Sequence, residues 1–273
     1  MLYRLRAAGH EGYLVGGGVR DLLLGREPKD FDVATDATPE EIRNVFRNCR
    51  LIGRRFRLAH VFFGREIIEV ATFRSSNDDG DRELEDGRLV RDNVYGTLEE
   101  DVLRRDFTVN ALYYNIEDFA LVDYVNGLDD LRDGRLRLLG DPVQRYREDP
   151  VRMLRAVRFA ARLGFMIDPA CEKPLIELPH LLESVPAARL FDEALKLFLT
   201  GHALQSFEKL RHYGLFAQLF PATEQSLSRE EHAFPITFVS RGMDNTDARV
   251  AEGKPVTPAF LFAVLLWEPV RLR

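Results

Sequence analysis

The spacing of the apolar residues changes near residue 140, and no other feature of the sequence constrains the fold as strongly. Before that point, short apolar runs such as YLV at 13–15 and EIIEVATF at 66–73 alternate with polar and glycine-containing turns, a pattern typical of strands. After it, apolar residues recur every three or four positions, which predicts helices. We therefore predict an α+β fold, with strands and helices in the first ~140 residues and helices in the remainder. One helix is predicted from ATPEEIRNVFRN at 37–48, with Thr38 as its N-cap and Glu41 three residues later in a capping box.

The composition is that of a globular protein. Hydrophobic residues make up 45% of the 273 residues and charged residues 30%, which argues against disorder. The net charge of −6 argues against a nucleic-acid-binding protein, but the basic residues are clustered. Cys49 and Cys171 lack metal-ligand spacing, so we expect a reduced, cytoplasmic protein.

The most apolar run is PAFLFAVLLW at 258–267, which is too short to span a bilayer and predicts a core helix. A domain seldom ends just after its most apolar helix. We therefore expect the chain to be part of a longer protein.

Two aspartates stand one residue apart in DFDVAT at 30–35, which predicts a strand. Residues i and i+2 of a strand point to the same face, so Asp30 and Asp32 would project together and Phe31 would point into the core. Like charges at that separation repel unless a cation lies between them, and a pair of Mg²⁺ ions fits. The alternative is two solvated acids on an edge strand.

A glycine-rich turn lies just upstream, in VGGGVRD at 15–21. Gly16 and Gly17 would let backbone N–H groups approach an anion, and Arg20 would add a cation for phosphate. No Gly-Lys-Ser/Thr follows, and Asp21 stands where a dinucleotide fingerprint needs glycine. A plain glycine turn is the alternative. Together with the aspartates, the turn predicts a nucleoside triphosphate held by Mg²⁺.

Two more acids are candidates for the same cluster. Glu69 lies in the apolar strand segment IIEVATF, and it could instead be a structural acid paired with Arg57 or Arg74. Asp106 follows two arginines in RRDFTVNAL, and its alternative is a salt bridge to one of them.

A basic helix is predicted from REDPVRMLRAVRFAARLG at 147–164, with Asp149 as its N-cap and Pro150 in its first turn. Its arginines recur at helical spacing and form one stripe, which is either a nucleotide or RNA contact or a solvated face. The stripe consists of Arg152, Arg155, Arg158 and Arg162.

Two further segments bear on RNA binding. LIGRRFRLAHV at 51–61 surrounds an aromatic residue with arginines, which fits contact with RNA but also an exposed strand edge. We expect His60 to pack beside Val61. The polar, acidic stretch at 75–92 predicts a mobile loop.

These motifs, in this order, resemble the class II branch of the polymerase β-like nucleotidyltransferases, which holds bacterial CCA-adding enzymes and poly(A) polymerases. The motifs are the glycine-arginine segment with DFD, RRDFTVNAL, DYVNGLDDL and EDPVRMLR, and LIGRRFRLAHV is similar to the poly(A) polymerase members. The resemblance implies a mixed-sheet nucleotidyltransferase head over 1–139, a helical neck over 140–200 that binds base and RNA, and a helical body over 201–273.

The resemblance also implies roles for individual residues. The catalytic acids would be Asp30, Asp32 and Asp106, and the metal ligands Asp30, Asp32 and Glu69. The nucleotide would contact Gly16, Gly17, Arg20, Arg105, Asn110, Arg155 and Arg158, and its base would be read by Asp149 and Arg152.

The expected reaction is addition of AMP from ATP to RNA 3′ ends with two Mg²⁺ ions. CCA addition to tRNA and an inactive RNA- or nucleotide-binding module are the alternatives. The resemblance implies RNA 3′ ends and ATP as partners, together with the RNA-degradation machinery and an RNA chaperone. The basic C-terminal extension of the poly(A) members is not found in this sequence.

Overall fold

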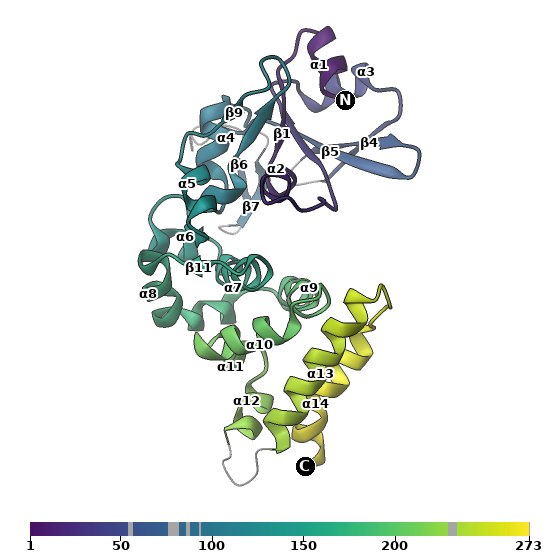
Figure 1. Cartoon of the computed structure of the whole chain (residues 1–273). Helices are drawn as coiled ribbons and strands as arrows, with labels where there is room; N and C mark the ends of the chain where they lie inside the picture. Colours follow the sequence, from purple (N-terminus) through teal and green to yellow (C-terminus); the bar gives the residue numbers. More distant parts are fainter. Residues whose placement is uncertain (54–56, 76–81, 86–87, 93, 229–233, 273) are drawn as a thin grey trace. The chain divides into compact units, whose positions relative to one another are not determined.

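A computed structural model describes residues 1–53, 57–75, 82–85, 88–92, 94–228 and 234–272. It forms two compact units, Met1–Asp133 and Gly134–Arg273. Figure 1 shows the sheet within the first unit and the succession of helices in the second. This arrangement confirms the α+β prediction.

The first unit contains a seven-stranded mixed sheet in the order β3-β4-β5-β2-β1-β8-β9. The pairing of β2 with β5 is parallel, and the other pairings are antiparallel. The strands are β1 (Gly12–Val15), β2 (Asp32–Thr35), β3 (Cys49–Ile52), β4 (Leu58–Phe63), β5 (Glu66–Thr72), β8 (Tyr113–Asn115) and β9 (Leu121–Val122). The helices are α1 (Leu2–Ala7), α2 (Gly17–Leu23), α3 (Pro39–Val45), α4 (Leu98–Arg104), the 3₁₀ turn η1 (Thr108–Asn110) and α5 (Gly127–Arg132).

One face of the sheet packs against α1 and α3, which lie next to each other in Figure 1. Val33, Val61 and Val70 point toward this face and bury their side chains against Ile42 and Phe46 of α3. The side chains between them in the sequence point to the other face, because strand residues alternate. The alternation places Asp32 and Glu69 on the face opposite the helix-covered core.

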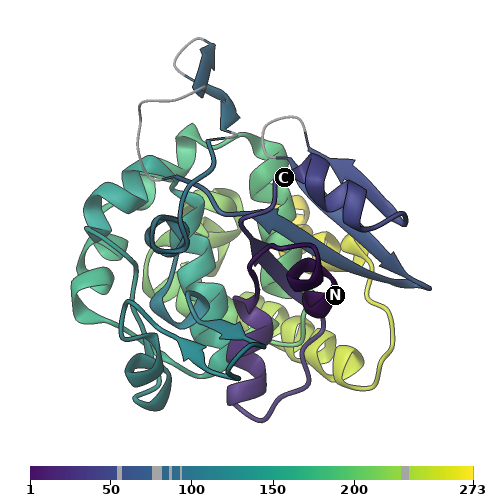
Figure 2. The same cartoon turned by 90° about the horizontal axis from the view of Figure 1, so that it is seen from above.

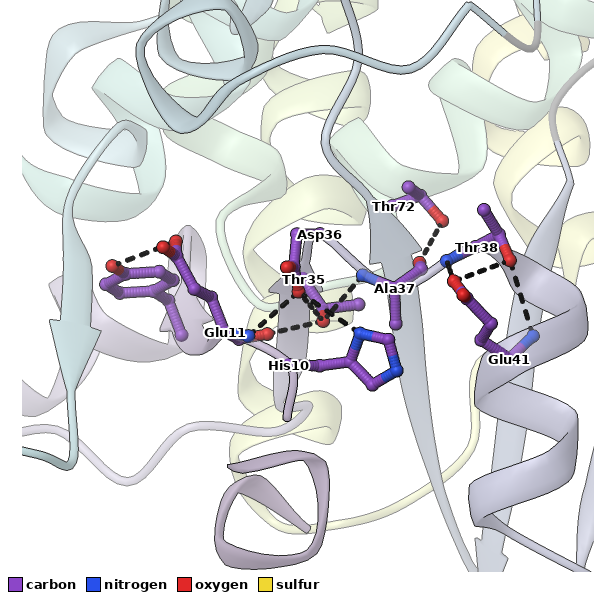
Figure 3. Close-up of polar contacts among 9 residues, drawn as sticks. His10, Glu11, Thr35, Asp36, Ala37, Thr38, Glu41 and Thr72 are labelled. Carbon is purple, nitrogen blue, oxygen red and sulfur yellow. Dashed lines mark hydrogen bonds and ion pairs between the residues drawn. The ribbon is translucent and has the colours of Figure 1, made fainter. Parts of the chain in front are cut away.

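The carboxyl end of β2 is fixed by polar contacts, drawn in Figure 3. Thr72 Oγ1 donates to the carbonyl of Ala37 at 2.7 Å, and the Ala37 N–H donates to Thr35 Oγ1 at 3.1 Å. Thr35 Oγ1 donates to the Glu11 carbonyl, and the Glu11 N–H donates to Asp36 Oδ1 at 2.8 Å. These bonds help hold β2 in register with β1 and β5, and so fix the position of Asp32 at its other end.

Helix α3 begins with the capping box that its sequence predicts. The Glu41 N–H donates to Thr38 Oγ1 at 3.4 Å, and the Thr38 N–H donates to Glu41 Oε2 at 2.8 Å. Residues close in sequence suffice for this motif, which explains why it could be read in advance.

The structure corrects three expectations in this unit. Strand β2 begins at Asp32, so Asp30 lies in the segment before it. Phe31 does not enter the core, because its side chain is 38% exposed. The stretch at 75–92 is not simply a loop, since β6 (Arg82–Glu85) and β7 (Arg88–Asp92) pair antiparallel as a separate small sheet, visible in Figure 2.

The second unit is mostly helical. Its helices are α6 (Pro142–Glu148), α7 (Val151–Leu163), α8 (Pro169–Glu177), α9 (Ala187–Phe198), α10 (Ala203–His212), α11 (Leu215–Leu219), α12 (Pro221–Leu227), α13 (Phe234–Ala251) and α14 (Pro258–Arg271), with a 3₁₀ turn η2 at Pro179–Ser184. It departs from the all-α prediction in a two-residue parallel pair, β10 (Arg135–Leu136) with β11 (Met166–Ile167). None of the helices described could cross a membrane, given their length and hydropathy.

Candidate active site

The acids of the candidate site gather on neighbouring strands. Asp32 at the start of β2 pairs in register with Glu69 on the parallel strand β5, and Asp30 lies just before β2. Burial raises the pKa of Asp32, the charges of Glu69 and Asp30 raise it further, and Arg105 opposes them. A partly buried carboxylate with two more acids beside it forms a site that favours a cation.

Glu69 has a partner that the sequence did not predict. Its half-exposed carboxylate lies 3.2 Å from His60 Nε2, on the adjacent strand β4. Arg57, one of the expected partners, pairs with Glu40 of α3. His60, expected only to pack beside Val61, therefore takes part in the polar face of the sheet.

The acids suit a Mg²⁺ ion that shares its ligands with water and substrate better than a metal ion whose ligands all come from the protein. Among the residues that the structure describes, no three acidic, histidine or cysteine side chains are grouped closely enough to hold an ion. Mg²⁺ commonly takes one or two carboxylates and completes its shell with waters and substrate phosphate oxygens. Asp30 and Asp32 provide such oxygens. Metal ligation by Asp30, Asp32 and Glu69 remains a prediction.

The glycine turn lies against these acids. Gly16 has a φ of 70°, which favours glycine, and it precedes α2 as its N-cap. A side-chain carbon added at Gly16 would lie 3.4 Å from the guanidinium of Arg105 and 4.0 Å from Asp32 Oδ2. The turn therefore places backbone close to Asp32, and its binding of phosphate remains a prediction.

Arg20 differs from the exposed phosphate ligand that we expected. Its side chain is 1% exposed and donates to Asp21 Oδ1 from Nε at 2.8 Å and from Nη2 at 2.6 Å. Its Nη1 donates to Asn110 Oδ1 at 2.5 Å. The sequence analysis assigned Asp21 no role beyond excluding a dinucleotide fingerprint. In the structure it is 3% exposed and forms the ion pair with Arg20.

Asn110 links the buried Arg20 to Asp106. Its Nδ2 donates to Asp106 Oδ1 at 3.2 Å, and the same oxygen accepts the Phe107 N–H at 2.8 Å. These bonds orient the carboxylate from within its own RRDFTVNAL segment. Asp21, Arg20, Asn110 and Asp106 thus form a continuous chain of polar contacts from α2 to η1.

A second polar group surrounds Arg105. Its Nε donates to the Tyr113 hydroxyl at 2.5 Å, and its Nη2 lies 3.2 Å from Asp101 Oδ2. The Tyr113 hydroxyl donates to the same Asp101 oxygen at 2.6 Å. Burial raises the pKa of Tyr113 far above its usual range, so the phenol stays protonated. The sequence analysis did not identify Asp101 and Tyr113. Asp101 stands four residues before Arg105, a spacing that brings side chains together on a helix, and Tyr113 lies in a predicted strand, so both positions carried a signal.

The motif DYVNGLDDL supports the catalytic segment from behind. Asp123 accepts the N–H groups of Gly127 at 3.0 Å and Leu128 at 2.9 Å, which shapes the turn into α5. A side-chain carbon at Gly127 would lie 2.3 Å from the Thr108 carbonyl, so only glycine fits there. Thr108 Oγ1 donates to the buried Asp130 at 2.7 Å. The motif is a scaffold for η1.

The predicted base-reading residues belong to the second unit. Helix α7 begins at Val151, one residue later than its sequence suggested, and Asp149 Oδ1 accepts the Val151 N–H at 3.3 Å. Asp149 also lies 3.1 Å from Arg189. Arg152 donates to the Arg145 carbonyl at 2.8 Å and to Glu148 at 3.1 Å.

The arginine stripe of α7 is not a plain solvated face. Arg158 lies 3.3 Å from the buried Glu193 of α9, and its guanidinium stacks over the Phe159 ring at 4.6 Å. Arg155 covers the same ring at 5.3 Å. Their roles in nucleotide binding remain predictions. In LIGRRFRLAHV, the segment Arg54–Phe56 lies outside the described residues.

Known proteins resemble this chain over most of its length. Residues 12–137 match the family "Poly A polymerase head domain", and residues 164–227 match "Probable RNA and SrmB- binding site of polymerase A". A poly(A) polymerase I from Haemophilus influenzae is 54% identical over 98% of this chain and 61% of its own length. A CCA-adding enzyme from Streptococcus suis is 34% identical over 100% of this chain and 70% of its own length. The chain belongs to the nucleotidyltransferase family of bacterial poly(A) polymerases and CCA-adding enzymes.

Solved structures of the family agree with this assignment. A tRNA nucleotidyltransferase complexed with a primer tRNA and an incoming ATP analog superimposes with a TM-score of 0.73 at 29% identity, covering 100% of this chain and 76% of that one. The resemblance read from the motifs is therefore confirmed. The chain spans 61% of the length of the Haemophilus influenzae relative.

Proposed function

We propose that this protein adds AMP from ATP to RNA 3′ ends without a template. The observation that supports this proposal most strongly is the cluster of Asp30, Asp32 and Glu69 beside the Gly16 turn, in a chain 54% identical to a poly(A) polymerase I. Two Mg²⁺ ions bound at these acids would supply the positive charge that activates the RNA 3′-hydroxyl and neutralises the departing pyrophosphate.

The protein's own residues mainly position the reactants. The backbone at Gly16 and Gly17 would approach the triphosphate, and Arg105 would add a positive charge close to Asp32. Asn110 would orient Asp106, with Arg20 holding the amide in place. Asp149 would accept a hydrogen bond from the exocyclic amine of the base, and Arg152 would donate to a ring nitrogen.

CCA addition to tRNA is the second candidate, because a CCA-adding enzyme is 34% identical over the whole chain. The lower identity makes it the weaker one. An inactive binding module is supported less, because placing the partly buried Asp32 beside two more acids is costly without a cation. Contacts with the RNA-degradation machinery or with an RNA chaperone remain predictions.

The test is extension of a labelled RNA of arbitrary 3′ sequence with Mg²⁺ and each nucleoside triphosphate separately. Long products with ATP alone are expected. Absence of products with all four nucleotides would contradict the proposal.

A further inference from the structure

A single row of polar side chains crosses four strands on one face of the sheet. The register pairs Asp32 on β2 with Glu69 on β5. It continues by pairing Glu69 with His60 on β4, and His60 with Arg50 on the edge strand β3. Residues opposite each other in a sheet point to the same face. The row therefore leads from the acids, by way of His60, to the cationic side chain of Arg50 on the edge strand.

Apolar side chains lie on the same face of the sheet as this row and are partly exposed. Ile52 lies two residues after Arg50, and Phe62 lies two residues after His60 and is paired with Ile67 of β5. Ile52 is 37% exposed, Ile67 is 46% exposed, and Phe62 is half-buried. We call Arg50, Ile52, His60, Phe62 and Ile67 the open face. The residues that alternate with them point the other way, toward the buried core under α1 and α3, as Leu51, Ala59, Val61 and Ile68 do.

The geometry of phosphoryl transfer indicates which reactant approaches the acids from this face. The attacking and leaving oxygens lie roughly in line across the reacting phosphorus. The glycine turn, where the triphosphate is proposed to bind, lies by Asp32 on the β1 side of β2. The attacking 3′-hydroxyl must then arrive from the opposite side, over β5, and β5 leads to β4 and β3.

We infer that the open face binds the last nucleotides of a single-stranded RNA 3′ end, an inference that rests on the proposed function. Arg50 is exposed and forms no ion pair with any residue in the described part of the chain, so its charge is available to a phosphate. Phe62 and Ile67 offer an aromatic and an aliphatic surface to bases. Exposed strands that combine cations with an aromatic residue bind single-stranded RNA by stacking and by phosphate contact.

The first test compares variants by steady-state kinetics at varied RNA concentration. Arg50→Glu and Phe62→Leu should each raise the KM for RNA about tenfold, on the scale of one lost phosphate or stacking contact. The KM for ATP and the kcat at saturating RNA should stay within about twofold, because neither residue touches the acids. Arg43→Glu, the same charge change on α3 of the covered face, and Phe62→Tyr, which keeps the ring, are matched controls.

The second test needs no catalysis. An RNA oligonucleotide with 4-thiouridine at its last three positions is irradiated with the whole chain, and the cross-linked peptides are mapped. Cross-links within 49–52 and 58–67 are expected. Cross-links confined to the second unit, or unchanged RNA affinity in both variants, would overturn the inference, as when another segment or a second copy covers this face. A wild-type protein that extends no RNA but cross-links at the open face would refute the proposed function alone.

Discussion

Asn110 donates a hydrogen bond from Nδ2 to Asp106 Oδ1 at 3.2 Å while its Oδ1 accepts one from Arg20 at 2.5 Å. The amide is thus held by a buried cation on one side and aligns a carboxylate on the other. Asn110→Asp would keep the acceptor for Arg20 but place a negative charge against Asp106. We predict that kcat falls about 100-fold while the KM for RNA changes less than about threefold.

The matched control for this variant is Asn115→Asp. Asn115 lies in the same unit, where its side chain accepts the Glu117 N–H in a turn. Steady-state extension kinetics on both variants would decide the matter. An Asn110→Asp enzyme with wild-type kcat would show that Asp106 does not depend on this alignment.

Asp32→Asn is predicted to reduce AMP addition about a thousandfold or more, because it removes a charge from the proposed cation site. Its fold should survive. The raised pKa of Asp32 means that the folded state binds this proton more tightly than the unfolded state, so the charge lowers stability as the pH rises above the ordinary value of 3.8. A neutral amide avoids that loss, and the melting temperature at pH 7 should equal or exceed that of the wild type.

Asp118→Asn is the control for Asp32→Asn, since Asp118 is exposed in the turn between β8 and β9, and asparagine can still accept its hydrogen bond from the Ala120 N–H. It should extend RNA within about twofold of the wild-type rate, because surface substitutions away from a site have small effects. Near-wild-type extension by Asp32→Asn would exclude Asp32 as the metal-binding centre.

Arg20→Ala is predicted to lower the free energy of unfolding by about 3–5 kcal/mol, because the buried Asp21 would lose its ion pair with the guanidinium. Arg132→Ala, which breaks an exposed arginine–aspartate pair, should cost at most about 1 kcal/mol. Urea unfolding measures both. If Arg20→Ala unfolds like the wild type but fails to bind ATP, Arg20 acts as a phosphate ligand and not as a structural cation.

Asp149→Ala is predicted to weaken the rejection of GTP and UTP by about tenfold to 100-fold relative to ATP. Adenine and cytosine present a donor then an acceptor to the pair Asp149 and Arg152, whereas guanine and uracil present the reverse, which leaves the carboxylate unpaired. Single-nucleotide extension with each triphosphate measures this. Glu177→Gln, on the surface of α8, is the control. Unchanged selectivity in Asp149→Ala would place base reading elsewhere.

The sequence predicted features that depend on near neighbours, such as the Thr38–Glu41 capping box and the glycine turn at Gly16. It could not predict that Glu69 pairs with His60, because that contact follows from the register of β4 and β5. The burial of Arg20 could not be predicted for the same reason, since its partner Asn110 lies 90 residues away in the chain. Long-range register decides which charged side chains are buried and which remain available to substrate.

The most direct measurement of the central claim is a competition in one tube. Equal amounts of an unstructured RNA and a tRNA lacking its CCA end are incubated with the protein, Mg²⁺, ATP and CTP, and the added sequences are read. The account predicts runs of adenylate on the unstructured RNA, abolished by Asp32→Asn. Addition of CCA to the tRNA, with the reaction stopping there and the unstructured RNA unchanged, would contradict it.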